Sequence, residues 1–254
     1  MSDSTDALGH VARSELLAGD EPDTSDAAVV ARLLTERFSC RAFKSEPVPR
    51  HIIEQMLTMA QMAPSWCNSQ PWNVIVTEGS STEDFRQVLY ARAEADMLSA
   101  GMQVPEPDVP FPSGYKGVYK ARQREVGWQL YRSLGIANGD RAASAKAALD
   151  NFRLFGAPHA LILTSERDLG AYGAVDCGVY IGALTLAAQS LGIGMIPQAA
   201  LAMYAPTIRQ HFDVAENRLI ILGASFGYPD LDHPANAFRS LRAPLSHIVQ
   251  WDKD

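Results

Sequence analysis

The 254-residue chain has few cysteines and no residue pattern typical of a metal site. Its three cysteines, Cys40, Cys67 and Cys177, are widely spaced and odd in number, so no disulfide framework is visible and a reducing compartment is indicated. The six histidines lack metal-ligand spacing, and we expect no metal. Paired carboxylates of the glycosidase kind and a Gly-x-Ser-x-Gly elbow are also missing. If the protein is an enzyme, a bound cofactor must carry its reaction, and we assign no catalytic residue.

The chain also lacks excess positive charge and long apolar runs. Its net charge of -7 argues against nucleic acid as the main partner, although it leaves a local anion site open. No apolar run approaches the length of a membrane span, so no membrane partner is expected. The acidic, Ser-rich N-terminus does not resemble a signal peptide. We therefore predict a cytoplasmic protein.

The pattern along the chain predicts one folded domain with a tail. Residues 1–24 have few large apolar side chains and are predicted to be a flexible tail. Residues 25–254 read as a single domain, because no linker or internal repeat interrupts them. A proline-rich loop and two helices, at about 95–150, form an excursion from this domain. Substrate contacts often lie in such excursions.

The expected elements make an α+β domain, with a small mixed sheet between helices. Apolar periodicity predicts helices over about 26–37, 49–62, 83–99, 118–134, 140–151, 174–191 and 206–212. Short apolar runs predict strands over 72–77, 159–164 and 219–223. The helix at 174–191 is apolar on nearly every side, which predicts central burial. In the first helix, Val30, Leu33 and Leu34 mark the apolar face.

The most informative segment is a polar loop, residues 63–70, between a helix and the strand that follows Pro71. Its side chains Ser65, Asn68 and Gln70 could hydrogen-bond the edge of a flat heterocycle. The alternative is ordinary turn chemistry, since Ser and Asn are common turn formers. The loop alone does not decide between these readings.

Two basic clusters lie near opposite ends of the chain. Arg37, Ser39 and Arg41 alternate, so in an extended segment their side chains share one face. Arg239 and Arg242 form the second cluster. If the clusters converge, their guanidinium groups make a phosphate clamp. If they do not, each is a solvated basic turn.

Two further features have open interpretations. Residues 192–198 contain Gly192 and Gly194 and are expected to form a bend after the apolar helix. Such a bend could lay its backbone against a planar ligand, or simply connect a helix to a strand. Asp176, near the expected start of that helix, either benefits from the helix dipole or is a buried hydrogen-bond acceptor. We favour a structural role for it.

Four blocks of residues, in order, resemble the FMN-dependent nitroreductase family. They are Arg37 to Phe43, the block Ala-Pro-Ser-x-x-Asn-x-Gln-Pro-Trp from Ala63 to Trp72, the helix and Gly-x-Gly from Asp176 to Gly194, and the ending from Gly227 to Leu245. The resemblance covers about residues 28–78 and 155–251. It implies a three-layer α/β/α sandwich with a mixed, mainly antiparallel sheet, in a domain-swapped homodimer.

The resemblance also implies the cofactor and its site. FMN would lie along the dimer interface, and NADH or NADPH would reduce it in ping-pong turnover with a nitroaromatic, quinone or similar small aromatic acceptor. Each site would take residues from both subunits. The residues it assigns to FMN are Arg37, Phe38, Ser39, Arg41, Pro64, Ser65, Trp66, Asn68, Met195, Ile196, Pro197, Gln198, Arg239 and Arg242. Of these, the residues from Pro64 to Asn68 would come from the partner subunit.

The excursion supplies only candidate contacts to the acceptor, because the family varies most there. They are Tyr115, Tyr119, Arg122, Arg124 and Tyr131. The alternative is that these side chains pack or solvate helices. Other functions within the family's reach are reductive dehalogenation, another flavin-dependent reaction, and flavin binding or redox sensing without turnover. The Glu, Tyr and Lys constellation expected of iodotyrosine deiodinases is not visible in the excursion.

Overall fold

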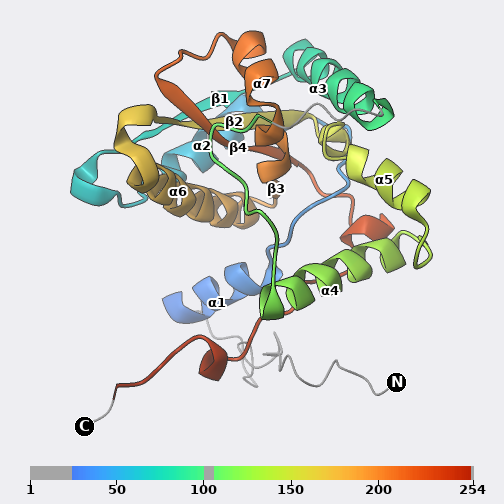
Figure 1. Cartoon of the computed structure of the whole chain (residues 1–254). Helices are drawn as coiled ribbons and strands as arrows, with labels where there is room; N and C mark the ends of the chain where they lie inside the picture. The colour runs from blue at the N-terminus through green and yellow to red at the C-terminus, as the bar shows by residue number, and fades with distance from the viewer. Residues whose placement is uncertain (1–24, 100–105, 253–254) are drawn as a thin grey trace.

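A computed structural model describes residues 25–99 and 106–252 (Figure 1). Its α-helices are α1 (Asp26–Glu36), α2 (Arg50–Ala60), α3 (Ser80–Leu98), α4 (Gly117–Ser133), α5 (Arg141–Leu149), α6 (Gly170–Ser190) and α7 (Ala205–Phe212). Its strands are β1 (Trp72–Val76), β2 (His159–Glu166), β3 (Gly194–Gln198) and β4 (Arg218–Gly227). The tail predicted at 1–24 lies outside the described residues.

The four strands form one sheet in the order β1-β2-β4-β3. Every neighbouring pair is antiparallel, and register places Trp72 opposite Ser165 and Met195 opposite Phe226. Parallel pairing occurs at an isolated bridge, where Ser39 lies beside Met195 on the outer edge of β3. The sheet is therefore mainly antiparallel, as expected from the sequence.

Helices cover both faces of this sheet. Leu161 and Leu163 of β2 pack in one apolar cluster with α2 and α6. Ala160 and Ile162 pack in another with α3, α7 and the 3₁₀ segment η6 (Ala199–Tyr204). Because successive strand residues point to opposite faces, this alternation shows an apolar layer on each side. The three-layer sandwich is confirmed.

Glycines inside strands account for two errors in the sequence prediction. Residues 194–198 form strand β3 rather than a bend, and β4 continues through Gly227 instead of ending at Gly223. A Cβ at Gly223 would lie 2.5 Å from Leu201 Cδ1, and one at Gly227 would lie 2.6 Å from Pro158 Cδ. These glycines admit neighbouring side chains within an intact strand, whereas sequence patterns treat glycine as a strand breaker.

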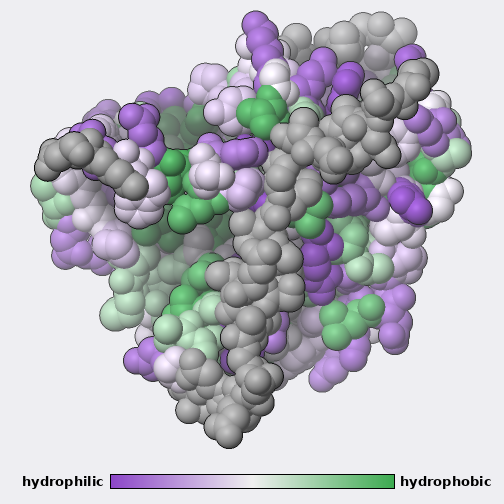
Figure 2. All heavy atoms as spheres, turned by 90° about the horizontal axis from the view of Figure 1, so that it is seen from below, coloured by the Kyte–Doolittle hydropathy of each residue, from purple (hydrophilic) through white to green (hydrophobic). Residues whose placement is uncertain are grey.

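The apolar helix α6 is buried on only one side, which corrects the prediction of burial all round. Its inner face packs on α2 and the sheet, but Tyr172, Val175 and Val179 on the outer face are 58%, 57% and 41% exposed. Val30 and Leu34, on the apolar face of α1, are likewise about half exposed. Seen from below, apolar side chains gather around a hollow in the part of the molecule where α1 and α6 lie (Figure 2).

The segment Arg167–Ser190, which contains α6, is also long and apolar enough to pass a test for a membrane span. Its packing against α2, β2 and β3 instead makes it the central helix of a soluble fold (Figure 1). The outer apolar face of α6 and the exposed side chains of α1 remain uncovered within the described residues.

Candidate functional site

The site is built where segment 37–43 crosses the edge of the sheet. After α1 ends, the chain extends along β3, and the Cys40 amide donates to the Met195 carbonyl over 3.3 Å. A Cβ at Gly194 would lie 2.9 Å from Cys40 Sγ, so glycine there permits the close approach. Cys40 is fully buried, which turns the alternating side chains of Ser39 and Arg41 away from the core.

Asn236 joins the C-terminal segment to this crossing. Its side chain is 3% exposed, accepts from the Arg41 amide over 2.7 Å and donates to the Ala42 carbonyl over 2.9 Å. Its Nδ2 also donates to the Asp230 carbonyl over 2.7 Å. This one amide therefore fixes the segment that carries Arg239 and Arg242 against the segment that carries Arg41.

The two basic clusters converge, which is the alternative that the sequence analysis linked to a phosphate clamp. Arg239 lies over the Phe38 ring, with its guanidinium carbon 3.8 Å from the ring centroid. Burial, and next the positive charge of Arg242, lower the pKa of the Arg37 guanidinium. Burial also lowers the pKa values of Arg41 and Arg239. We call Arg37, Arg41, Arg239 and Arg242 the arginine cluster.

Carboxylates lie near the arginine cluster without pairing with it in the described part of the chain: Asp230 shares a cavity with Arg41, and Glu125 shares one with Arg242. Within residues 25–99 and 106–252, no carboxylate forms an ion pair with any of its members. Burial raises the pKa of the Cys40 thiol to about 11, so this thiol is neutral and does not supply a negative charge to the cluster. An anion stabilises like charges that are held close together, and guanidinium groups match the oxygens of a phosphate.

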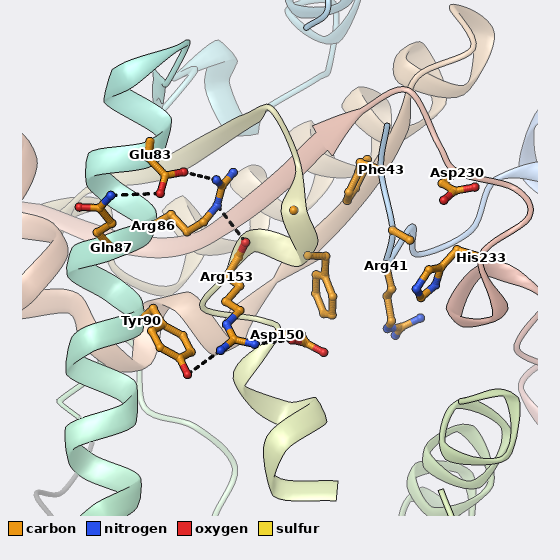
Figure 3. A pocket seen from close by; sticks show the side chains of 13 residues that line it. Arg41, Phe43, Glu83, Arg86, Gln87, Tyr90, Asp150, Arg153, Asp230 and His233 are labelled. Atoms are coloured by element: carbon orange, nitrogen blue, oxygen red, sulfur yellow. Dashed lines mark hydrogen bonds and ion pairs between the residues drawn. The ribbon is translucent and has the colours of Figure 1, made fainter. Parts of the chain in front are cut away.

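Arg41 also lines a cavity of about 550 Å³ beside this cluster. The opposite walls come from α3 and from the turn between α5 and β2 (Figure 3). Within these walls Arg153 lies over the Tyr90 ring and donates to its hydroxyl over 2.7 Å. The cavity thus combines an aromatic wall with charged groups of both signs. Its lining includes Arg41, Phe43, Glu83, Arg86, Tyr90, Asp150, Arg153, Phe155, Asp230 and His233.

The turn that forms one wall has a strained backbone. Leu154 and Phe155 have φ angles of 56° and 52°, in the left-handed region that disfavours residues with a side chain. Arg86 of α3 holds this turn, donating to the Arg153 carbonyl over 3.1 Å and to the Ala157 carbonyl over 2.6 Å. These two carbonyl groups lie outside the regular helices and strands, and Arg86 supplies each of them with a hydrogen-bond donor.

The segment 195–198 mostly faces inward. Met195, Ile196 and Gln198 are buried, and Pro197 is partly exposed. The Gln198 amide accepts from Ser225 Oγ over 2.5 Å and donates to the Asn151 carbonyl over 3.0 Å. Of the four residues assigned here to a flavin, Pro197 is therefore the one whose side chain reaches the surface.

The polar loop is shaped by backbone strain and by a buried carboxylate. Cys67, Asn68 and Gln70 have φ angles of 52°, 55° and 45°. Ser65 Oγ accepts from the Gln70 amide over 2.9 Å, which is the turn chemistry weighed above for this residue. Trp66 is 59% exposed and meets the Tyr172 ring edge-on at 4.3 Å. The loop therefore presents an aromatic side chain outward on a constrained backbone.

Within one chain, the polar loop and the arginine cluster lie at opposite ends of the fold. The loop contacts Asp176, about 20 Å along the α6 axis from Ser190, after which the chain reaches Met195. The sheet register gives the same separation. Trp72 lies opposite Ser165 near one end of β2, whereas Met195 and His159 both lie opposite Phe226, at the other end of β2. Six residues of β2 also span about 20 Å. Pro64, Ser65, Trp66 and Asn68 therefore do not meet the arginines of their own chain.

The candidate acceptor residues do not form one group. Arg122 lines a cavity of about 390 Å³ with Ser240 and Arg242, between α4 and the C-terminal segment. Arg124 and Tyr131 line a different cavity, of about 540 Å³, between α4 and α5. Tyr115 and Tyr119 are 48% and 64% exposed. The structure thus separates these five residues among three surroundings.

Three residues of the site escaped the sequence reading. Asn236 lies in a turn, Asn151 follows a helix, and Arg86 belongs to a mixed polar face of α3. None of them belongs to a periodic or motif pattern. Arg86 acts through contacts 67 and 71 positions away in the sequence, and Asn236 through contacts 194 and 195 positions away. A single sequence contains no signal for such contacts.

Comparison with known proteins agrees with this geometry. The family model described as "Nitroreductase family" matches residues 34–228. Nitroreductase NfnB of Mycolicibacterium smegmatis is 32% identical over 233 residues, covering 91% of this chain and 96% of that protein. A 4-nitrobenzoate reductase of Nocardioides sp. is 32% identical over 227 residues, covering 86% of this chain and 88% of the relative.

A solved structure gives the same result for the fold. The FMN-dependent nitroreductase NfnB from Mycobacterium smegmatis, in complex with NADPH, superposes with a TM-score of 0.83 at 33% identity. The match covers 90% of this chain and 100% of that one. From the matched residues and the shared fold, this chain belongs to the nitroreductase family.

Proposed function

We propose that this protein is an FMN-dependent NAD(P)H oxidoreductase that reduces nitroaromatic compounds, quinones or similar acceptors. The observation that carries the proposal is the arginine cluster, assembled from both ends of the chain and, among the described residues, in no ion pair with a carboxylate. Relatives named for FMN, for NADPH and for 4-nitrobenzoate support the same chemistry. No residue of the chain is assigned as an acid, base or nucleophile, so the cofactor carries the reaction.

The residues present fit FMN. Arg37, Arg239 and Arg242 supply the cations for its phosphate, and Arg41 lies between that end and the cavity beside α3. Phe38 supports Arg239 from below through its ring. When bound, FMN would take two electrons from NADH or NADPH and pass them to the acceptor. The chain's own groups bind the cofactor, orient it and set the charge around it.

The proposal includes a homodimer. Pro64, Ser65, Trp66 and Asn68 lie about 20 Å from the arginine cluster of their own chain, so they serve a flavin only in a second copy. The outer apolar face of α6 and the exposed side chains of α1 provide the surface that such a copy would cover. A two-fold arrangement would pair the loop of each subunit with the cluster of the other.

Acceptor contacts and cellular location are also part of the proposal. Tyr115 and Tyr119 are exposed and can meet an aromatic acceptor, whereas Arg122 shares its cavity with Arg242 and better suits the phosphate end. Arg124 and Tyr131 lie on another face of α4 and are the weakest candidates. The three free thiols favour the cytoplasm.

An anaerobic two-step experiment tests the function. The purified protein, loaded with FMN, is mixed with NADH or NADPH, and then with 4-nitrobenzoate or a quinone. We expect the flavin absorbance to bleach in the first step and to return in the second. A protein that does not bind FMN would contradict the proposal. Bound flavin that bleaches but is not reoxidised by any acceptor would indicate binding or sensing without turnover.

A further inference from the structure

Asp176 is a buried carboxylate that holds the polar loop. It is 7% exposed in the second turn of α6, on the helix face that packs inward. Both of its oxygens lie 3.2 Å from the Trp66 amide nitrogen, and Oδ2 also accepts from Ser69 Oγ over 3.3 Å. A buried polar group requires such partners, and these hydrogen bonds of Asp176 all go to the polar loop.

The loop needs an external support because its backbone is strained. Three of its residues, Cys67, Asn68 and Gln70, have positive φ without being glycine. Conformations of this kind persist only where surrounding structure fixes them, and they cluster at functional sites. Asp176 grips the loop on both sides of Cys67, at the Trp66 amide and at the Ser69 hydroxyl. Removing the carboxylate therefore releases the strained part.

We infer that Asp176 is a positioning residue for the flavin site of the partner subunit. It fixes Ser65, Trp66 and Asn68 in the form that reaches across the interface, while leaving its own subunit's arginine cluster untouched. The separation of about 20 Å along α6 supports this division. The inference rests on the proposed function, and it adds that a helix buried in one subunit controls cofactor binding in the other.

Dimers of mixed composition test the direction of this effect. One subunit carries Asp176→Asn, which keeps the side-chain shape but replaces one acceptor oxygen with a donor. The other carries Arg37→Ala with Arg242→Ala, which removes two cations of the arginine cluster. The two forms are co-expressed with different tags, and the mixed dimers are isolated. FMN stoichiometry and affinity are measured by quenching of flavin fluorescence, with each homodimer measured in parallel.

We expect both variant homodimers to bind FMN at least about tenfold more weakly than the wild type, from the loss of charged hydrogen bonds. The mixed dimer should bind one FMN per dimer at wild-type affinity. In the mixed dimer, the altered loop of one subunit and the altered arginine cluster of the other belong to the same site. The second site has an unaltered loop and an unaltered cluster. Thr185→Ala, on the same helix but bonded to the Gly182 carbonyl, is the matched control and should change nothing.

Two outcomes would overturn the inference alone. They are wild-type FMN affinity in the Asp176→Asn homodimer, and a mixed dimer with no tight site, which would mean that Asp176 acts within its own subunit. Wild-type affinity in the arginine double variant is different, because it would contradict the proposed phosphate site itself. If Asp176→Asn does not fold, Ser69→Ala removes one loop contact outside the core. It should show the same mixed-dimer pattern with a smaller change in affinity.

Discussion

At the scale of residues, Arg37 and Arg242 show how a binding site can be kept ready for an anion. The protein holds the half-buried Arg37 and the exposed Arg242 close enough for the charge of Arg242 to lower the pKa of Arg37. Asn236 fixes the geometry through backbone contacts, so the arrangement does not depend on a bound ligand. The repulsion that remains between the cations is available to favour phosphate binding.

Replacing Arg242 tests this idea. We expect Arg242→Ala to weaken FMN binding by about 1.5–3 kcal/mol, or about 10- to 150-fold, the usual range for a charged hydrogen bond. The melting temperature of the FMN-free protein should stay the same or rise slightly, because a repulsive neighbour of Arg37 is removed. Fluorescence titration with FMN and thermal denaturation without it measure the two effects.

The control is Arg32→Ala, which removes an exposed arginine paired with Glu36 one turn before Arg37. Its FMN affinity should equal that of the wild type. An equal loss of affinity in both variants would mean that general surface charge, rather than the arginine cluster, attracts the cofactor.

His159 is a second residue whose environment fixes its charge. The buried ring accepts from the Val48 amide at Nε2 over 2.9 Å and lies 3.1 Å from the Thr77 carbonyl at Nδ1, which assigns the proton to Nδ1. It thereby joins the connector before α2 to the end of β1 and the start of β2. Burial lowers the pKa of His159 in the folded protein.

This lowered pKa gives stability a direction with pH. Because the unfolded histidine binds its proton near pH 6.5 and the folded one only at lower pH, the His159 contribution is complete above about 6.5. It is lost as pH falls below that value, by at most about 1.4 kcal/mol per pH unit. In urea denaturation at pH 7.5 and 5.5, His159→Gln should lose less stability between the two pH values than the wild type. The exposed His51→Gln should behave like the wild type.

At the scale of elements, the turn after α5 shows how a helix can hold a strained wall. Leu154 is fully buried and Phe155 lines the cavity, so neither position can become glycine without loss of packing or lining. The left-handed backbone at both residues is therefore retained, and Arg86 of α3 satisfies the carbonyls on either side. Asp150 and Arg153 reach the cavity only if this turn keeps its form.

Arg86→Lys should lower the free energy of unfolding by about 1–2 kcal/mol, since an ammonium group cannot reproduce the two-carbonyl geometry. Phe155→Gly relieves the left-handed strain, and in the double variant it should recover part of that loss. Urea denaturation of the four proteins in this cycle gives the coupling. Gln87→Ala, in the same cavity wall but bonded to Glu83, is the control. Additive losses without recovery would exclude this role for Arg86.

Much of this element structure could be predicted from the sequence, and the errors have identifiable causes. Apolar periodicity predicted the helix at about 49–62, and its residues Ile53 and Met56 are buried in α2, because periodicity reports contact with a nearby layer. Strand β3 was missed because Gly194 and Pro197 resemble a turn when their neighbours are unknown. The outward apolar face of α6 was assigned to the core, since periodicity cannot distinguish a core from an uncovered surface.

At the scale of the whole molecule, the order of motifs predicted both halves of the site, and the family resemblance assigned the polar loop to the partner subunit. Arg37 and Arg242, 205 positions apart in the sequence, converge, whereas Arg37 and Ser65, 28 positions apart, lie at opposite ends. The resemblance implied the separation without a distance, and the path of α6 and the sheet register supply that distance within one chain. The polar loop, whose sequence suggested a ligand contact, therefore has no site in its own chain, and the central claim becomes that two chains complete each flavin site.

Dilution of the FMN-loaded protein tests this claim most directly. Molecular mass, from light scattering or mass photometry, and the fluorescence of released FMN are followed together as protein concentration falls. We expect FMN to leave in step with the conversion of dimer to monomer, because each monomer keeps the arginine cluster but loses the polar loop of its partner. A monomer that retains FMN with the affinity of the dimer would contradict the account.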